Sequence, residues 1–318
     1  MAEVIEPTFH KVVDGINGSE GPVFTRDGRF FCVAPEVFTK EGTLWYATPG
    51  AAPGDPGAIY QVDLKKKTKT RLTALEVDGN WGMPSGLQSD RENNLWVADM
   101  TLGILKVTLD GNIKQIAKVD DQGETMQGCN DCMFDYEGNL WVTGPGGDIA
   151  PNPFRVSVQE AFGCVYCLTT TGKVIKAATG FLVSNGLAVK HKDGKPYLLI
   201  VAETMTQSLW AFDIIGPGQV TNRRLWGKLP ASPNAVGPDG MDLDEVGNLL
   251  VANMGEGHLE VFGPNGGAPQ TRIKLPFDKP SNLHFKQNSN ICYVTEHTNN
   301  ALWWFEWKHK GRKEYCDL

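Results

Sequence analysis

The sequence lacks long apolar runs and any excess of basic charge. No stretch approaches the 18 consecutive apolar residues that predict a membrane-spanning helix. Thirty basic side chains stand against 37 acidic ones, a formal charge of -7, and the basic residues gather only in short runs such as 65–67. We therefore expect binding to neither nucleic acid nor a membrane. The first eleven residues lack the apolar core of a signal peptide, which favours a cytoplasmic protein.

Paired cysteines and familiar catalytic motifs are scarce too. The seven cysteines, an odd number spread from Cys32 to Cys316, do not fit a disulfide framework and favour reduced thiols. Two C-x-x-C pairs begin at Cys129 and Cys164, but the second lies in a strand-like run, where positions i and i+3 face opposite sides and cannot easily share a zinc ion. The G-x-S-x-G, H-E-x-x-H and phosphate-loop motifs are missing, which argues against the enzyme classes that depend on them.

Turn residues and short apolar segments are abundant, and they form a repeat. The 36 glycines and 19 prolines separate short segments rich in Val, Leu, Trp and Phe without helical periodicity, which predicts nearly all strand. One pattern recurs six times: a polar residue, a small residue, an apolar strand, a turn, and a second strand ending in Val-Ala or Val-Thr. Because 318 residues divided by six gives 53, the size of a four-stranded blade, we predict an all-β fold: a single six-bladed β-propeller domain over 1–318. We expect residues 4–12 to supply the outer strand that closes the ring, and 48–57 to form a surface loop.

The repeats place oxygen-bearing side chains around the central channel. The six copies begin at Glu20, Ser85, Asn130, Asn185, Asp239 and Ser281. Turn chemistry would explain the serines and asparagines but explains Glu20 poorly. Two carboxylates among amides would repel each other without a cation, and an all-oxygen cage suits calcium better than magnesium. We therefore predict a calcium ion in the channel.

Two further layers follow from the repeat. The second layer lies three positions further along the first strand of each repeat, about 10 Å deeper in the channel. It contains Val23, Gln88, Met133, Ala188, Asp242 and His284. Asp242 and His284 belong to neighbouring repeats and could bind a second ion or simply pair with each other. The second strands return to the first mouth at Glu36, Met100, Pro145, Thr204, Met254 and His297. We interpret this set as a pocket wall, in which His297 is either functional or an ordinary buried histidine.

The chain resembles a known family at these residues. The most specific stretches are 20–24 (EGPVF), 126–132 (MQGCNDC), 239–242 (DGMD), 280–285 (PSNLHF) and 295–297 (TEH). On these, and over nearly its whole length, the chain is similar to the molluscan diisopropyl fluorophosphatases, calcium-dependent six-bladed propellers of the wider gluconolactonase and regucalcin-like group. The resemblance implies two calcium ions. A catalytic ion would be held by Glu20, Asn130, Asn185 and Asp239, and a structural ion by Asp242, His284 and the Leu283 carbonyl.

The pocket departs from that family. Met254 and Val183 stand where squid-type enzymes have an aromatic wall, Val158 replaces another large side chain, and the 48–57 insert is longer than its counterpart. We assign to the substrate pocket Glu36, Met83, Met100, Val158, Val183, Thr204, Met254 and His297. The resemblance implies hydrolysis of the phosphorus–fluorine bond in organophosphorus fluorides, with no obligate protein partner.

The sequence leaves two alternatives for the nucleophile and two rival hypotheses for the function. Calcium can polarise a phosphoryl oxygen, and fluoride is a good leaving group. Either Asp239 attacks phosphorus and forms a covalent intermediate, or calcium-bound water attacks with Asp239 as base. His297 would shape the pocket or carry a proton. A lactonase of the same architecture, or a noncatalytic calcium-binding propeller, is the rival hypothesis.

Overall fold

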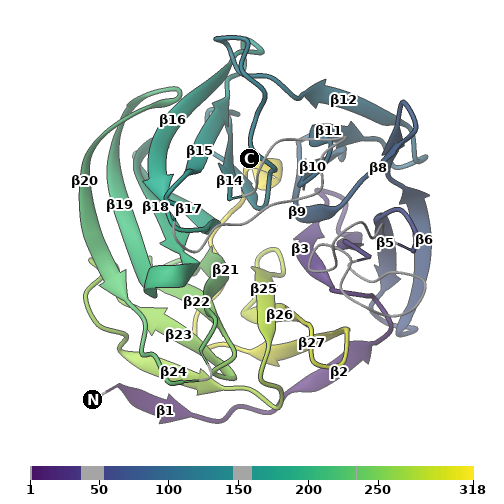
Figure 1. Cartoon of the computed structure of the whole chain (residues 1–318). Coiled ribbons are helices and arrows are strands. Elements are labelled where there is room, and N and C mark those ends of the chain that lie inside the picture. The colour runs from purple at the N-terminus through teal and green to yellow at the C-terminus, as the bar shows by residue number, and fades with distance from the viewer. Residues whose placement is uncertain (1, 37–53, 146–159, 234) are drawn as a thin grey trace.

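Strands account for nearly all the secondary structure. The computed structural model describes residues 2–36, 54–145, 160–233 and 235–318. Figure 1 shows six twisted sheets standing around a central axis like the blades of a propeller, as the repeat predicts. No helix in these ranges has the length and apolar character needed to cross a membrane.

Four blades are formed from consecutive strands. Blade one contains β3 (Glu20–Phe24), β4 (Phe30–Ala34), β5 (Ala58–Asp63) and β6 (Thr68–Ala74). Blade two contains β9 (Pro84–Ser89), β10 (Leu95–Asp99), β11 (Gly103–Val107) and β12 (Ile113–Ala117). Blade three contains β13 (Cys132–Phe134), β14 (Leu140–Gly144), β15 (Gly163–Leu168) and β16 (Val174–Phe181), and blade four β17 (Ser184–Lys192), β18 (Lys195–Glu203), β19 (Ser208–Gly216) and β20 (Gln219–Lys228).

The N-terminal strands complete the other two blades. Blade five contains β21 (Gly237–Leu243), β22 (Leu249–Met254), β23 (His258–Phe262) and β24 (Thr271–Lys274), and blade six β25 (Pro280–Phe285), β26 (Ile291–Glu296) and β27 (Ala301–Glu306). Strand β2 (His10–Val13) pairs antiparallel with β27 as the outer strand of blade six. Strand β1 (Glu3–Ile5) pairs parallel with β24 and adds a fifth strand to blade five. The ring is thus closed by the N-terminal segment as expected, but that segment serves two blades.

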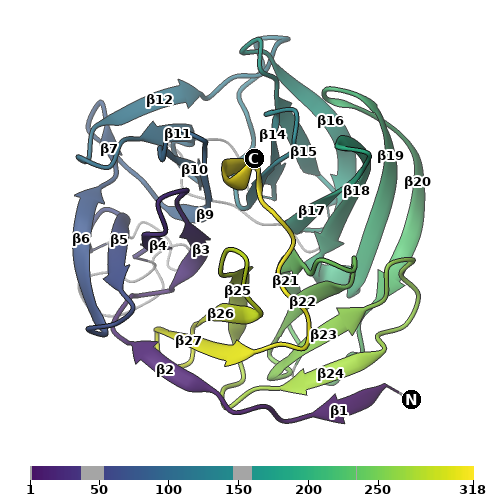
Figure 2. The ribbon, with the colours of Figure 1, turned by 180° about the vertical axis from the view of Figure 1, so that it is seen from behind.

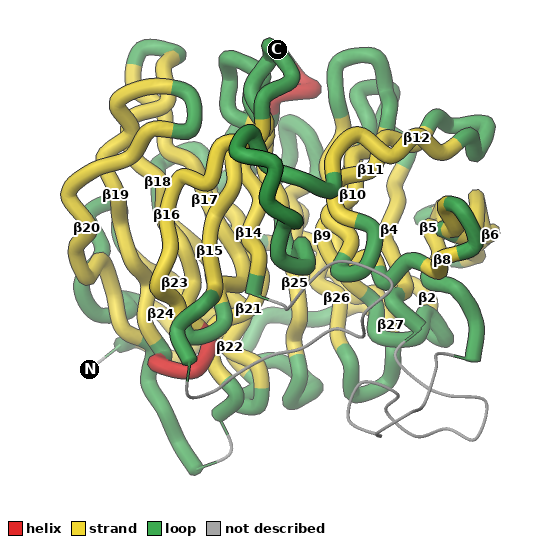
Figure 3. Tube along the Cα trace, turned by 45° about the horizontal axis from the view of Figure 1, so that its top comes forward, coloured by secondary structure: helices red, strands yellow, loops and turns green. Residues whose placement is uncertain are grey.

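Small elements lie outside the blades. Strands β7 (Glu76–Val77) and β8 (Asn80–Trp81) form a separate hairpin between blades one and two. Two short 3-10 helices, η2 (Thr204–Thr206) and η3 (Tyr315–Asp317), lie at opposite ends of the molecule (Figure 3). We call the end with η2 the mouth of the channel and the end with η3 its floor.

Apolar side chains fill the spaces between adjacent blades. Trp141, Phe181 and Phe262 are fully buried in a cluster that joins blades three, four and five. The turns between first and second strands are fixed by aspartates: Asp135 Oδ1 accepts the backbone N–H of Asn139 (2.9 Å), and its Oδ2 accepts the indole N–H of Trp141 (3.0 Å). The related segments 90–96 (DRENNLW), 135–141 (DYEGNLW) and 244–250 (DEVGNLL) therefore each encode a turn that an aspartate holds in place.

The C-terminal residues 307–318 cross the floor of the channel. Figure 2 shows this segment running over the centre of the ring. Its hydrogen-bond partners come from the six blades in turn: Phe24, Arg91, Tyr136, Val189, Leu243 and Ser289. A segment that binds every blade at the axis closes one end of the channel.

Candidate functional site

The innermost strands β3, β9, β13, β17, β21 and β25 contact one another in ring order and line the channel. In four blades the ladder to the second strand is irregular at the same place, between Glu20 and Val23 and at the equivalent steps of β17, β21 and β25. Such a bulge releases residues from strand pairing and turns their side chains. Asn185 and Asp239 lie inside these bulges, which explains how the predicted ligands face the channel.

Glycines let the innermost strands approach each other closely. A Cβ atom added to Gly186 would lie 2.2 Å from the backbone oxygen of Asp239, and one added to Gly240 would lie 2.2 Å from the Asn282 side chain. Glycine follows the first polar residue in four repeats, and the small residue of the sequence pattern is therefore a packing requirement. In the other two repeats this position holds Asp131 and Asn282.

Glu20 and Asp239 form a buried, mutually repelling pair near the mouth. Both residues are buried. Burial raises the pKa of each carboxyl well above its usual range, and the negative charge of Glu20 raises that of Asp239 further. His297 Nε2 lies 3.4 Å from Glu20 Oε1 without making a hydrogen bond, and burial lowers the pKa of this imidazole. A neutral imidazole leaves the two carboxylates without a full countercharge.

Asn185 is held by its neighbours, and Asn130 lies at the start of blade three. The Asn185 amide nitrogen donates to Thr204 Oγ1 (3.3 Å), and the Thr204 hydroxyl donates to the Pro238 carbonyl (2.8 Å). The amide oxygen of Asn185 therefore remains available to a ligand. Asn130 precedes β13, is half-buried and donates its backbone N–H to Thr143 O (2.8 Å).

The deeper layer brings Asp242 and His284 together. His284 Nδ1 lies 3.6 Å from Asp242 Oδ2, and the backbone N–H groups of Leu243 (2.7 Å) and Phe285 (3.0 Å) donate to the two oxygens of Asp242. Burial raises the pKa of the Asp242 carboxyl, and the Arg312 guanidinium opposes that rise. A narrow cavity beside them, lined by Asp131, Asp242, His284 and the Leu283 residue among others, has room for about one water-sized sphere. The three predicted ligands of the structural ion thus share one small cavity.

Two charged or polar residues of the channel were missed by the sequence analysis. Asp131 is buried, lines the deep cavity, and has a pKa raised to about 7, mainly by burial. The Asn282 amide hydrogen-bonds to both Glu20 and Asp131 and so bridges the two layers. The repeat contained a signal for both residues, because Asp131 and Asn282 occupy the position that holds a close-packed glycine in the other four copies.

The described residues assigned to the pocket wall lie at or next to the ends of blade strands on the mouth side. Met100 and Thr204 directly follow β10 and β18, His297 directly follows β26, and Met254 is the last residue of β22. The Met83 carbonyl accepts a hydrogen bond from Met100 N (2.9 Å), and both side chains are buried.

Val183 takes a left-handed conformation (φ 63°), which is strained for a β-branched residue, and its carbonyl accepts the Thr204 N–H (3.0 Å). Glu36 follows β4 and accepts a hydrogen bond from Asn17 (3.0 Å). Val158 and most of the 48–57 loop lie outside the described residues.

The donor set favours a hard cation. Within the described ranges, no group of three or more His, Cys, Asp or Glu side chains could hold a metal by itself. An ion in either layer would therefore depend on amide or carbonyl oxygens as well, which suits calcium. The seven cysteines are buried and free, and burial raises the pKa of each thiol, so they offer no ready thiolate.

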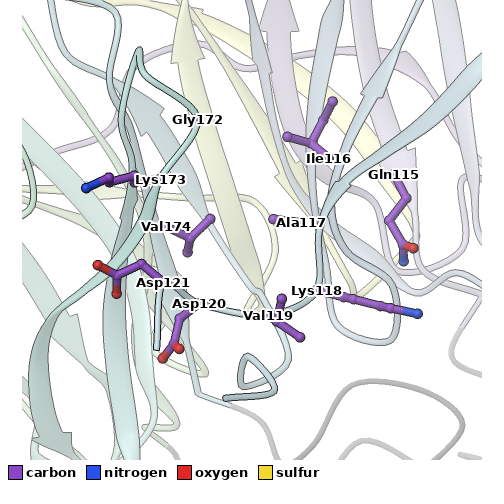
Figure 4. Close-up of a pocket in the computed structure, with 10 residues that line it drawn as sticks. All are labelled: Gln115, Ile116, Ala117, Lys118, Val119, Asp120, Asp121, Gly172, Lys173 and Val174. Carbon is purple, nitrogen blue, oxygen red and sulfur yellow. The ribbon is translucent and has the colours of Figure 1, made fainter. Parts of the chain in front are cut away.

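A second hollow lies away from the channel. It is a surface groove between β12 and the 172–174 turn of blade three, lined by Lys118, Asp120, Asp121 and Lys173 among others (Figure 4). Asp120 is paired with Lys176 at 3.4 Å. The groove therefore presents mixed charge at the outside of the ring and none of the predicted site residues.

Comparisons with known proteins agree with this architecture. Residues 100–298 match the family described as "SMP-30/Gluconolactonase/LRE-like region". The chain is 52% identical to the diisopropyl-fluorophosphatase of Loligo vulgaris over 317 residues, covering 99% of this chain and 96% of the squid protein. It is 23% identical to the gluconolactonase of Zymomonas mobilis over 91% of its length and 78% of that enzyme. Among solved structures, a calcium-binding regucalcin from Agrobacterium tumefaciens superposes with a TM-score of 0.73 at 17% identity, covering 99% and 98% of the two chains, which supports the fold alone.

Proposed function

Because this chain belongs to the SMP-30/gluconolactonase/LRE-like family and, within it, to the diisopropyl-fluorophosphatases, we propose that it is a calcium-dependent hydrolase that cleaves the phosphorus–fluorine bond of organophosphorus fluorides. The observation that carries the proposal is the buried pair Glu20 and Asp239 at the mouth of the channel, with Asn185 beside it. Without a cation these two buried carboxylates would repel each other, which supports a metal ion bound beside them.

The charges of the channel support two divalent ions. At the mouth, Glu20 and Asp239 contribute two negative charges when ionised. Towards the floor, three buried carboxyls, Asp131, Asp242 and Glu314, stand against the single guanidinium of Arg312, which again leaves two negative charges. One calcium ion in each layer would balance four negative charges with four positive ones. The ion at the mouth would be held by Glu20, Asn130, Asn185 and Asp239, and the deep ion by Asp242, His284 and the Leu283 carbonyl.

Bound calcium would polarise the phosphoryl oxygen of the substrate as a Lewis acid and stabilise the charge of the transition state. Asp239 is our candidate nucleophile. One of its carboxylate oxygens forms a bond to phosphorus while the phosphorus–fluorine bond breaks and fluoride leaves with the electron pair. Water then cleaves the mixed anhydride, which restores the Asp239 carboxylate and yields the phosphoric acid diester and a proton. Because burial raises the pKa of Asp239 in the protein alone, its nucleophilic form depends on a cation nearby.

The remaining residues position and enclose the substrate. The imidazole of His297 is partly buried beside Glu20 and can relay a proton or shape the pocket without carrying charge. Met83, Met100 and Met254 supply flexible apolar surface for the ester substituents.

A fluoride electrode tests the activity directly. We expect fluoride release from diisopropyl fluorophosphate that stops when a calcium chelator is added and returns when calcium is restored. Turnover of sugar lactones without fluoride release would favour a lactonase. Calcium binding without turnover of either substrate would indicate a noncatalytic propeller.

Heavy-oxygen water separates the two nucleophiles. If Asp239 attacks, one turnover in labelled water places the label on the Asp239 carboxylate, because water opens the mixed anhydride at the carboxyl carbon and the original Asp239 oxygen leaves with phosphorus. Mass spectrometry of the peptide that contains Asp239 measures this. An unlabelled peptide beside a labelled phosphoric product would contradict the assignment of Asp239 and favour direct attack by water.

A further inference from the structure

The floor of the channel contains a buried cation that belongs to the C-terminal segment. Arg312 contacts Met133, which lines the deep cavity, and is held by strands β13, β17 and β21. Its guanidinium donates to the Val189 carbonyl, to Met133 Sδ (3.2 Å) and, more weakly, to Glu314 Oε1 (3.4 Å). Its backbone N–H donates to Leu243 O (3.1 Å), next to Asp242. These bonds fix a permanent positive charge against the deep layer.

The charge of Arg312 is not neutralised by one partner alone. It interacts electrostatically with both Asp242 and Glu314, and Glu314 Oε2 is buried without a hydrogen-bond partner. Two other nearby acids interact with groups other than Arg312. Asp244 is close to Lys190, and Asp317 is half-buried and accepts the Glu314 N–H (3.0 Å). Arg312 is therefore the guanidinium shared by the carboxyls of the floor.

The segment that carries Arg312 is anchored independently of that charge. The Tyr136 hydroxyl donates to Lys313 O (2.6 Å), and the guanidinium of Arg91 stacks on the Tyr315 ring at 4.4 Å. The Tyr136 ring in turn stacks on His191 at 3.7 Å. The position of residue 312 can thus be kept while its charge is changed.

We propose that Arg312 is a positioning residue of the deep ion site: it supplies a fixed internal cation that holds Asp242 and Glu314 in place whether or not a calcium ion is bound. The inference rests on the proposed calcium function. With Arg312 in place, the floor has two negative charges to offer a divalent ion; without it, the floor has three. Removing the guanidinium therefore destabilises the ion-free protein while it increases the electrostatic attraction for the ion.

The test compares melting temperatures in excess calcium and in excess chelator. Arg312→Gln should lower the melting temperature of the chelated protein by roughly 5–10 °C, the scale expected for breaking a buried charge cluster. The loss in calcium should be clearly smaller. The difference between the melting temperatures in calcium and in chelator, which we call the gap, should therefore widen. Arg312→Lys, which keeps the charge, should retain a gap close to that of the wild type. Tyr136→Phe, which loosens the segment without changing charge, should lower both temperatures equally.

A variant that makes the floor less negative, where Arg312→Gln makes it more negative, keeps the test decisive if Arg312→Gln does not fold. Glu314→Gln removes one negative charge from the floor and should narrow the gap. Equal gaps in the wild type, Arg312→Gln and Glu314→Gln would overturn the inference while leaving the fluoride assay unaffected. A gap in Arg312→Lys that matches Arg312→Gln would also overturn it, because packing and hydrogen bonds would then explain the effect. A wild type whose melting temperature ignores calcium would overturn both this inference and the calcium requirement.

Discussion

Thr204 shows how a side chain outside the predicted ligand set can decide the geometry of a ligand. Its hydroxyl accepts from the Asn185 amide nitrogen and donates to the Pro238 carbonyl, so it links the innermost strands of blades four and five. The Thr204 hydroxyl thereby helps to fix the orientation of the Asn185 amide, which also hydrogen-bonds to the Asp239 carboxyl. Residues that orient a ligand in this way commonly affect metal affinity as strongly as weak ligands do.

Thr204→Val should weaken calcium binding at the mouth by roughly tenfold, because the isosteric valine can neither accept from Asn185 nor donate to Pro238. Calcium titration of the chelator-treated protein measures this. Thr204→Ser keeps the hydroxyl and is the matched control. Equal affinities for the valine and serine variants would show that Thr204 does not orient Asn185.

Met254 controls the width of the pocket in our assignment. It ends β22 at the mouth, is half-buried, and its carbonyl accepts the Val236 N–H (2.8 Å). Met254→Trp should narrow the range of phosphoryl substituents that are hydrolysed, since a rigid ring replaces an adaptable chain, and should leave calcium affinity nearly unchanged. Rates with a series of substrates of increasing size provide the measurement. Val246→Trp, at an exposed turn remote from the mouth, is the control; an unchanged range in Met254→Trp would remove Met254 from the pocket.

At the scale of elements, the innermost strand is both a wall of the channel and a packing surface for the next blade. The bulges turn polar side chains inward, and the glycines after them admit the neighbouring backbone. These two requirements act on adjacent residues, which is why the repeat begins with a polar residue and a small one. A substitution at the small residue should therefore disturb the ligand of the neighbouring strand.

Gly186→Ala should lower the free energy of unfolding by about 2–3 kcal/mol, because the new methyl group would overlap the Asp239 backbone, which cannot move freely in a packed ring. Calcium affinity at the mouth should fall with it. Urea unfolding and calcium titration measure the two effects. Gly216→Ala is the control, since its nearest neighbour is the Gln219 side chain at 3.7 Å; equal losses in the two variants would contradict this packing role.

The elements that a repeat specifies were predictable, and contacts between repeats were not. The repeat aligns the first residues of the innermost strands, and the structure has Glu20, Asn185 and Asp239 on strands that line the channel. Asp131 and Asn282 meet only because different blades converge, and no spacing along the chain encodes that meeting. Arg312 lies outside the repeat altogether, and its position depends on a segment that no periodic pattern describes.

At the scale of the whole molecule, the channel concentrates acid groups whose ionisation favours folding only with cations present. Burial raises the pKa of Glu20, Asp131, Asp239, Asp242 and Glu314 above their ordinary values. A carboxyl whose pKa is raised by folding stabilises the folded state at low pH and loses that contribution as the pH rises through the folded-state pKa. For Asp131 this pKa is about 7.

The chelated protein should therefore lose stability, by about 1 kcal/mol net, between pH 6.5 and pH 8.5. The buried histidines, whose pKa values are lowered by burial, oppose part of the loss just above pH 6.5, because about half of each histidine is still protonated in the unfolded chain at that pH. With calcium bound, the same interval should have little effect. Urea unfolding at both pH values in chelator and in calcium provides the comparison; a chelated protein that becomes more stable at pH 8.5 would contradict the charge assignment.

The way in which the ring is closed has a consequence for biosynthesis. Strands β1 and β2 leave the ribosome first, yet their partners β24 and β27 are translated near the end of the chain. The first two strands must therefore wait with unpaired edges while blades one to four emerge and assemble. A ribosome stalled before β27 would carry an open arc instead of a ring, in which blade six has neither its own third strand nor a partner for β2. The segment 307–318, which bonds to all six blades, is translated after β27, so the floor of the channel closes only once the ring is complete.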